Sequence, residues 1–350
     1  QVGDRRQLYA ATWGLWFFDE VRMNFEIARQ LGDELLVLAE EQSDEALLLQ
    51  ARHAAWTTSL YRGEPRRAYD HAEQGRALYR ANRDHALAAA YGGHDAGACC
   101  RYTAGHASWL LGYPDRGLDC AEDAVAFAKR LGHPMSLCIA EMVLTIICQC
   151  RGEVDRVGEL AEELVASATR QGLVWYAATG AVLQGWALAA RGESAIGIDK
   201  MQVGLDQLHA AGAGLRRSYL LWLLAETLMR VGDLGQSSRA LSEALRFVSK
   251  RGEGWWQAEL HRLEGALRLQ QDGAATDQAE ACFRKSLDVA RRQEVKSLEL
   301  RAARDLARLW AGQGRRAEAR DLLAPVYGWF TEGFETADLE DARTLLDTLS

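Results

Sequence analysis

Apolar residues along the chain recur at the three- and four-residue spacing of helices, and turns containing glycine divide these helices into pairs. Seven segments repeat one order, namely an apolar helix, a short turn and a second apolar helix. The turn glycines are Gly63, Gly112, Gly152, Gly192, Gly232, Gly273 and Gly314. Successive glycines are 49, 40, 40, 40, 41 and 41 residues apart. This regular period predicts a stack of helical hairpins.

Small side chains occupy fixed places around each turn. Gly105 and Gly185 stand seven residues before their turn glycines, and Gly117 and Gly197 stand five residues after them. Small residues at such points let paired helices approach closely. The order of small residue, turn, small residue and large apolar residue resembles the tetratricopeptide repeat. Its period exceeds the roughly 34 residues of the usual unit, and resembles the extended variant found in the sensor domain of the maltose-regulon activator.

We therefore expect an all-α protein, an α-α superhelix of seven to eight hairpins over residues 1–332. Residues 333–350 carry an amphipathic pattern, and we expect a helix that caps the last pair. The first helical segment contains Trp13, Trp16, Phe17 and Phe18. It is too aromatic for a solvated end, so we expect it to dock on a part of the polypeptide that precedes Gln1.

The composition changes this picture little. The 350 residues are 48% hydrophobic and 26% charged, with 4 prolines, which is typical of a soluble helical protein. Its apolar runs are shorter than the roughly 18 residues of a membrane span, so we expect no membrane contact. Lys and Arg number 41 against 49 Asp and Glu, and the net charge of −8 makes nucleic acid an unlikely partner.

The seven cysteines show no spacing of a disulfide framework, and Cys99 and Cys100 are adjacent. We therefore expect a reducing, cytoplasmic location. Cys148 and Cys150 lie about 200° apart around a helix and cannot share a metal ion. The chain begins at Gln1 rather than at a methionine, so we expect a fragment of a longer protein.

Signatures of catalysis are absent from the sequence. None of the five lysines follows a glycine, which excludes a nucleotide-binding P-loop. The chain has no Gly-x-Ser-x-Gly, His-Glu-x-x-His or Cys-x-x-Cys motif. We therefore expect a chain that is not an enzyme and that needs no cofactor or metal ion.

The pair His94 and Asp95 lies in the one interval that is stretched to 49 residues, after the helix breakers Gly92 and Gly93. Insertions in repeat arrays often serve binding. A His-Asp pair can hold a metal ion or relay a proton. The alternative is that Asp95 caps a helix N-terminus and His94 packs beside it.

In a tetratricopeptide-like superhelix the first helix of each pair lines the concave surface. Counting back from each turn glycine predicts a face that is aromatic in the middle and basic at one end, suited to a peptide, a protein segment or a small ligand. The expected binding residues are His94, Asp95, Cys99, Tyr102, His106, Trp109, Trp175, Trp186, Tyr219, Trp222, Glu226, Trp256, Arg301, Arg304 and Arg308. The alternative is that the tryptophans pack between repeats and that the arginines pair with acidic neighbours.

Several stretches resemble the C-terminal tetratricopeptide-like region of large bacterial proteins that carry a class III adenylate/guanylate cyclase domain and a STAND-type ATPase domain. The stretches are Trp13–Phe17, Tyr91–Asp95, Trp255–Gly265, Lys296–Ala303 and Leu322–Leu339, the last of which is the most specific. The resemblance implies that cyclase and ATPase domains precede Gln1 in the same polypeptide.

Our leading hypothesis is a non-catalytic sensor and scaffold arm that binds a partner on its inner face and regulates the attached domains. The alternative is a free-standing adaptor that captures peptides or proteins. If the inner face binds the partner, we expect Trp222→Ala to weaken partner binding and to leave the melting temperature nearly unaltered.

Overall fold

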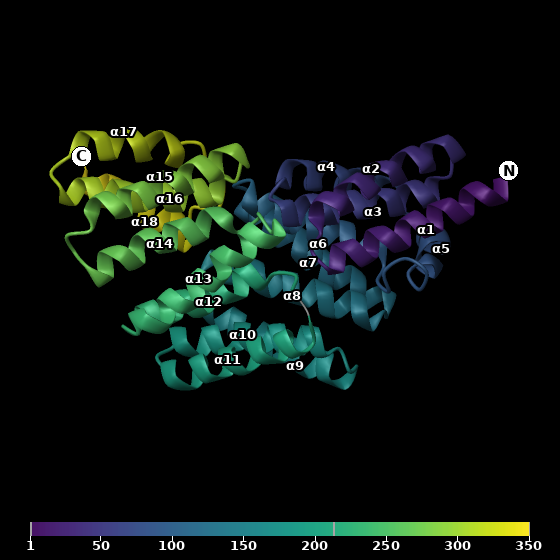
Figure 1. Cartoon of the computed structure of the whole chain (residues 1–350), viewed down its shortest axis with the longest axis horizontal. Coiled ribbons are helices and arrows are strands. Elements are labelled where there is room, and N and C mark those ends of the chain that lie inside the picture. Colours follow the sequence, from purple (N-terminus) through teal and green to yellow (C-terminus); the bar gives the residue numbers. More distant parts are fainter. Residues whose placement is uncertain (1, 213, 350) are drawn as a thin grey trace.

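The structure, a computed structural model, describes residues 2–212 and 214–349, and within these ranges the chain forms helices and no strand (Figure 1). The expected all-α class is confirmed. The first ten α-helices are α1 (Val2–Val21), α2 (Phe25–Gln42), α3 (Glu45–Arg62), α4 (Pro65–Leu78), α5 (Ala81–Asp84), α6 (Ala96–Leu110), α7 (Pro114–Leu131), α8 (Pro134–Arg151), α9 (Val154–Arg170) and α10 (Val174–Ala190). The rest are α11 (Ser194–Ala210), α12 (Arg217–Arg230), α13 (Leu234–Arg251), α14 (Gln257–Gln271), α15 (Thr276–Arg292), α16 (Lys296–Gly312), α17 (Arg316–Tyr327) and α18 (Ala337–Thr348), with a 3-10 turn η1 (His85–Leu87) after α5.

The helices pair into hairpins, beginning with α1–α2 and α3–α4 and ending with α16–α17. Each of the seven expected glycines lies in the turn of a hairpin, as the period predicts. Six of them have φ between 80° and 100°, the left-handed conformation that glycine adopts without steric cost. Gly273 differs, because α14 ends in the extended residue Asp272, whose carboxylate accepts a 2.9 Å hydrogen bond from the Ala274 amide.

Small residues permit backbone contact within the hairpins, as expected. A Cβ atom placed on Gly185 in α10 would lie 2.5 Å from the carbonyl oxygen of Gly197 in α11. The equivalent atom on Gly105 in α6 would lie 2.8 Å from the carbonyl oxygen of Gly117 in α7. Any side chain at these points would force the helices apart.

The first helices of successive hairpins, from α3 and α6 through to α16, contact one another and form the inner layer of the superhelix. The chain curves until its two halves meet, so that α6 contacts α16 (Figure 1). The amide of Gly254 donates to the Tyr61 carbonyl at 2.8 Å, and the hydroxyl of Ser297 donates to the Trp109 carbonyl at 2.5 Å. These contacts close the inner side of the curve.

Among the described residues α8 is the one helix long and apolar enough to cross a membrane by length and composition, with a mean hydropathy of 1.3. Within the protein 78% of that helix is buried. Its apolar character therefore matches a central position in the inner layer, where both of its sides pack against other hairpins.

The two ends of the superhelix differ. Helix α18 packs on α16 and α17 and buries Leu339 and Ala342 there. The expected division into residues 1–332 and 333–350 stays a prediction. The terminal residues Gln1 and Ser350 lie outside the described part of the chain. At the other end α1 turns Trp13 and Trp16 inward and leaves Phe18 50% exposed.

Candidate functional site

The expected open aromatic face is filled in this structure, because the superhelix curves until its inner helices pack on each other. Trp109 of α6 stacks on Trp256, which precedes α14, with ring centroids 5.9 Å apart. Tyr219 meets Trp256 edge-on, with ring centroids 5.1 Å apart, and donates a 2.8 Å hydrogen bond to Gln149 of α8. The expected binding residues that are buried in this way are Cys99, His106, Trp109, Trp186, Tyr219, Trp222 and Trp256. For the four tryptophans in this set, burial agrees with the alternative of packing between repeats.

The expected basic end of the groove is a network of buried ion pairs. Arg301 contacts Glu259 of α14 and Asp338 of α18, and its guanidinium also donates to the Cys150 carbonyl at 2.8 Å. Arg304 pairs with Asp305 and Asp338. These guanidinium groups hold α14, α16 and α18 together, so they are not free to receive a partner.

Arg308 and Glu226 lie outside the buried core of the inner face. Arg308 is exposed and approaches Asp305 at 3.4 Å. Glu226 is half-buried on α12. Nothing in the structure brings either residue to the cavity described below.

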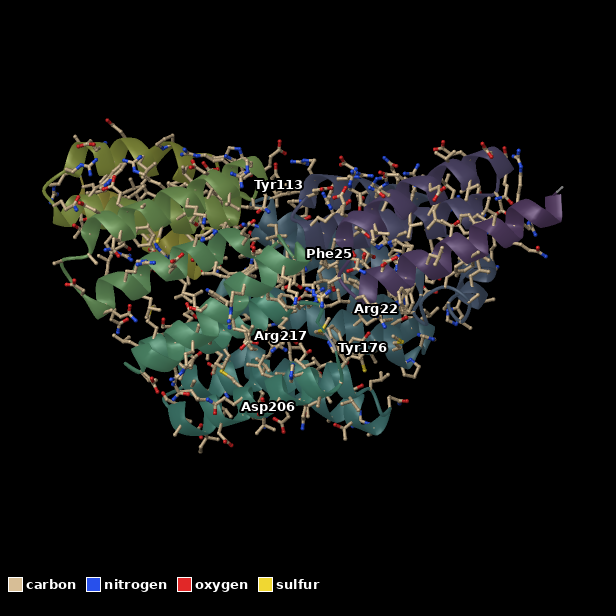
Figure 2. All side chains as sticks on the ribbon, viewed as in Figure 1. Arg22, Phe25, Tyr113, Tyr176, Asp206 and Arg217 are labelled. Atoms are coloured by element: carbon tan, nitrogen blue, oxygen red, sulfur yellow. The ribbon has the colours of Figure 1, made fainter. Side chains whose placement is uncertain are left out.

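One cavity of about 550 Å³ does remain on the inner side, at the N-terminal end of the superhelix. Its walls come from α1, α3, α6, α8 and α10, and the loop between α11 and α12 closes one side. Arg22, in the turn after α1, and Tyr176 of α10 line it, and both are labelled in Figure 2. Three of the expected binding residues also line it, namely His94, Tyr102 and Trp175. Their binding role stays a prediction.

Aromatic rings supply much of the cavity wall. Trp13 and Phe17 of α1 stack with centroids 5.5 Å apart, and Trp175 meets Tyr176 edge-on at 4.7 Å. Tyr102 of α6 completes this wall. Such rings offer a large apolar contact area in fixed positions, as ligand sites do.

Four buried polar atoms of lining residues have no hydrogen-bond partner within the described chain. They are Trp13 Nε1, Glu20 Oε1, Thr57 Oγ1 and Arg216 Nε. Buried polar atoms in native proteins nearly always have partners. The cavity beside these four atoms has room for a molecule or water that could satisfy them.

Glu20 projects from α1 into this cavity and is almost fully buried. Thr58 of α3 donates a 2.7 Å hydrogen bond to its carboxyl group and accepts one from Trp16 Nε1 at 2.9 Å. Loss of water around the carboxyl raises the pKa of Glu20 to about 8. Glu20 is therefore mainly protonated at neutral pH and can donate a hydrogen bond to a ligand.

Arg216 reaches the cavity from the opposite side, at the start of α12. Its backbone is left-handed, with φ 65°, and the buried carboxylate of Glu253 accepts from its amide. The guanidinium lies 3.3 Å from His106 Nδ1 and 5.4 Å from the centroid of the Tyr61 ring. A permanent positive charge thus lies at an aromatic wall.

The stretched interval brings a third polar group to the same wall. Asp95 is the N-cap of α6 and accepts from the amides of Gly97 and Ala98, so the capping alternative is correct for this residue. His94 lies beside it, with its ring 4.8 Å from that of His53 in α3. Burial is the main cause that lowers the pKa of both histidines, that of His53 well below its usual value.

Sequence reasoning missed Glu20, His53 and Arg216. Glu20 follows Asp19, His53 follows Arg52 and Arg216 precedes Arg217, with no motif around any of them. Glu20 also stands four residues after Trp16, on the same face of an aromatic-rich helix, which is the one signal that marks it in the sequence.

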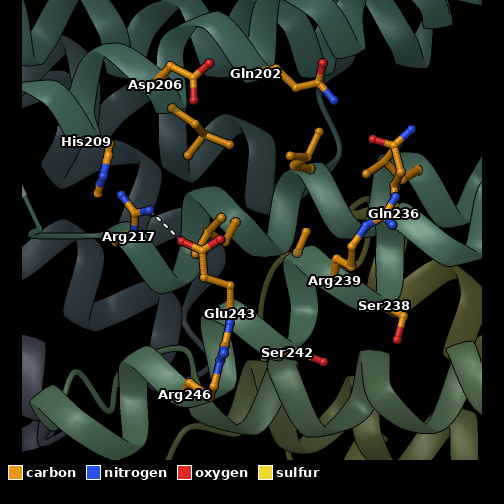
Figure 3. A pocket seen from close by; sticks show the side chains of 15 residues that line it. Gln202, Asp206, His209, Arg217, Gln236, Ser238, Arg239, Ser242, Glu243 and Arg246 are labelled. Atoms are coloured by element: carbon orange, nitrogen blue, oxygen red, sulfur yellow. Dashed lines mark hydrogen bonds and ion pairs between the residues drawn. The ribbon is translucent and has the colours of Figure 1, made fainter.

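A second hollow of about 880 Å³ lies between α11, α12 and α13 (Figure 3). It has polar side chains such as Asp206 and Arg239 at its rim, and Arg217 pairs with Glu243 across it. None of the described side chains that line it has a buried polar atom without a partner. This hollow is an open gap between hairpins, and it gives no sign of a particular ligand.

Comparison with known proteins finds no family model that matches this chain. An uncharacterized protein of Rhizobium meliloti, R02095, is 24% identical over 314 residues. The match includes 90% of this chain and 30% of the relative. The chain thus spans about 30% of the length of the curated relative that it matches.

Solved structures share the fold over nearly the whole chain. The Rap conjugation gene regulator of plasmid pLS20, in complex with the Phr* peptide, gives a TM-score of 0.60 at 10% identity. That alignment covers 98% of each chain. NprR in complex with its cognate peptide NprX gives 0.55 at 9% identity, over 97% of this chain and 96% of that one. These similarities establish the tetratricopeptide-like superhelix.

Proposed function

We propose that the chain is a non-catalytic sensor and scaffold arm that binds a peptide or a small ligand in the 550 Å³ cavity. The observation that carries the proposal is the set of four unpartnered polar atoms inside an aromatic enclosure. The similar Rap and NprR structures are complexes with the peptides Phr* and NprX, which supports a peptide as the ligand class.

The cavity indicates the chemistry of this ligand. The aromatic wall formed by Trp13, Tyr102 and Trp175 suits an apolar side chain or ring. Arg216 suits a carboxylate, since a guanidinium donates several hydrogen bonds to an anion. The protonated Glu20 suits an acceptor such as a peptide carbonyl. We propose a short apolar peptide or a small organic acid.

We further propose that the arm belongs to a longer polypeptide with cyclase and STAND-type ATPase domains. The Leu322–Leu339 stretch resembles the C-terminal region of bacterial cyclases with a STAND-type ATPase domain, which supports this proposal. The greater length of the Rhizobium relative also supports it. Helix α1 forms one wall of the cavity and exposes Leu8, Leu15 and Phe18 on its outer side. A ligand that binds two arrangements of α1 with different affinity would shift the attached domains between two states.

A binding assay tests the cavity. Isothermal titration of a library of short apolar peptides and small carboxylates is expected to find ligands that Trp175→Ala weakens at least about tenfold, roughly 1.4 kcal/mol. Trp329→Ala is the matched control, because Trp329 is also half-buried but lies outside the cavity. Equal affinity in the Trp175→Ala variant and the wild type would reject this cavity as the site.

The regulatory role has its own test. Deleting residues 2–349 from the longer polypeptide should alter its cyclase output or its response to the ligand. Unchanged basal activity and an unchanged response contradict a regulatory arm. The alternative of a free-standing adaptor is favoured by the near-complete coverage of the Rap chain, 98%. Sequencing the coding region upstream of Gln1 distinguishes the two hypotheses. An in-phase segment that encodes further domains supports the arm, and a start codon near Gln1 supports the adaptor.

A further inference from the structure

Two imidazoles and a thiol meet at the wall of the cavity. His53 comes from the middle of α3, His94 from the loop before α6, and Cys99 from the first turn of α6. One ring nitrogen of each histidine and the Sγ atom of Cys99 lie within 4.8 Å of one another. His53 and Cys99 are almost fully buried, while His94 is half-buried.

Hydrogen bonds orient these three groups. His94 Nδ1 lies 3.0 Å from the Gly92 carbonyl and His53 Nδ1 lies 3.4 Å from Gln50 Oε1, and both partners are acceptors. The Nδ1 atoms therefore carry the protons, which leaves a lone pair on each Nε2 atom. Trp56 Nε1 donates to Cys99 Sγ at 3.2 Å, a contact that stabilises a thiolate. Outer hydrogen bonds of this kind accompany metal ligands in proteins.

We propose that His53, His94 and Cys99 bind one thiophilic metal ion, Zn²⁺ or Cu⁺. Two imidazole nitrogens and a thiolate are the donors that these ions prefer, whereas Mg²⁺ and Ca²⁺ prefer oxygen. Metal–ligand bonds of about 2.0–2.3 Å put donors roughly 3.5 Å apart. The three donor atoms, now within 4.8 Å, must draw together by about an ångström at the widest pair.

The nearest carboxylate does not complete the set. Asp95 is committed to the amides of Gly97 and Ala98, to the Tyr79 hydroxyl and to His85. His53 and His94 both line the cavity, so a fourth ligand can come from it as water or as a donor group of a bound molecule. The metal site is independent of the identity of that molecule.

A titration of the metal-free chain tests the site. Zn²⁺ is added in competition with a chromophoric chelator, Cu⁺ under reducing anaerobic conditions with bicinchoninate, and Mg²⁺ as the oxygen-preferring control. We expect one equivalent of Zn²⁺ or Cu⁺ per chain, a dissociation constant at least tenfold weaker in Cys99→Ser and His94→Gln, and no effect of Mg²⁺. Cys100→Ser is the matched control, because Cys100 is adjacent to Cys99 and equally buried, but its thiol donates to the Gly97 carbonyl.

Co²⁺ gives a second readout, and its first result comes from the wild type alone. Bound to the wild type, Co²⁺ should show thiolate-to-metal charge-transfer absorption, which Cys100→Ser keeps and Cys99→Ser removes. Absence of this absorption together with absence of stoichiometric uptake by the wild type overturns the proposal. Uptake that is equal in the wild type and Cys99→Ser also overturns it. Circular dichroism of each variant verifies the helical fold.

Discussion

Several of the polar side chains that this protein buries line its cavity. Glu20, His53 and Arg216 reach it from three different elements. Each loses water on folding, and each has part of its hydrogen-bonding capacity unused or held by one neighbour. Such residues cost stability, so they point to a function that retains them.

Glu20 makes the stability of the protein depend on pH. Its carboxyl ionises near pH 4.5 in the unfolded chain and near pH 8 in the folded one. Between these values the folded state holds the extra proton. The contribution of Glu20 to stability is therefore fully present below about pH 4.5 and falls as the pH rises towards 8, by up to about 1.4 kcal/mol per pH unit. Glu20→Gln removes this contribution. Urea unfolding at pH 5 and pH 7.5 should show that Glu20→Gln loses less unfolding free energy between the two pH values than the wild type does. Equal losses in the two proteins would contradict the effect of burial on Glu20.

Trp222 was expected from the sequence to contact a partner, and the structure reverses the expected effect of its removal. The ring is 1% exposed, and its centroid lies 5.1 Å from that of Trp256. Trp222→Ala should therefore cost about 3–5 kcal/mol of unfolding free energy through the cavity that it leaves. Trp175→Ala, at a half-buried ring, should cost clearly less. Urea denaturation of both variants compares them, and a Trp222→Ala variant as stable as wild type would restore the original expectation.

At the scale of the element, the hairpin is the unit that the repeats build. Each hairpin contains a glycine in its turn and small residues on its two facing helices. This set recurs about every forty residues along the chain. In the α10–α11 pair, Gly185 and Gly197 face each other backbone to backbone. The pair has no room for a methyl group at this contact.

Gly185→Ala should destabilise the protein by about 1–3 kcal/mol, because its Cβ would lie 2.5 Å from the Gly197 carbonyl oxygen. Gly14→Ala in α1 is the control, since nothing lies within 4 Å of a Cβ there. That change should raise helix stability by up to about 1 kcal/mol. Chemical denaturation gives both values. A neutral Gly185→Ala would mean that α10 and α11 separate without cost.

At the scale of the whole molecule, the superhelix closes on itself, which an open repeat array does not. The hydrogen bond from Ser297 to Trp109 joins residues 188 apart in sequence, and that from Arg301 to Cys150 joins residues 151 apart. Contacts of this kind couple the two halves of the chain. An open array would instead be stabilised by neighbouring repeats alone.

The closure predicts that the two halves unfold together. In native-state hydrogen exchange, the most protected amides of α6 and α16 should open with the same free energy, and Gly185→Ala should lower both equally. The reason is that α6 and α16 contact each other across the closed curve. Loss of protection confined to α10 and its neighbouring hairpins would show that the repeats behave as an open array.

The sequence predicted the fold well and the site only in part. The positions of six turn glycines and the Asp95 cap follow from local preferences, since a left-handed turn and a helix N-terminus each involve a few adjacent residues. His94, Tyr102 and Trp175 were selected in advance, and they share one cavity. His53 was missed because it comes from a helix in the preceding hairpin.

By itself the sequence determined the hairpins and their order, because these depend on the spacing of apolar residues and on glycine at fixed points. The tertiary structure alone decided which inner-face residues are exposed, because the curvature of the stack results from packing between residues far apart in the chain. That curvature buries Trp256 and Arg301 and leaves the cavity open near Glu20. Helical periodicity gives the direction in which a side chain points, and it does not show what lies opposite.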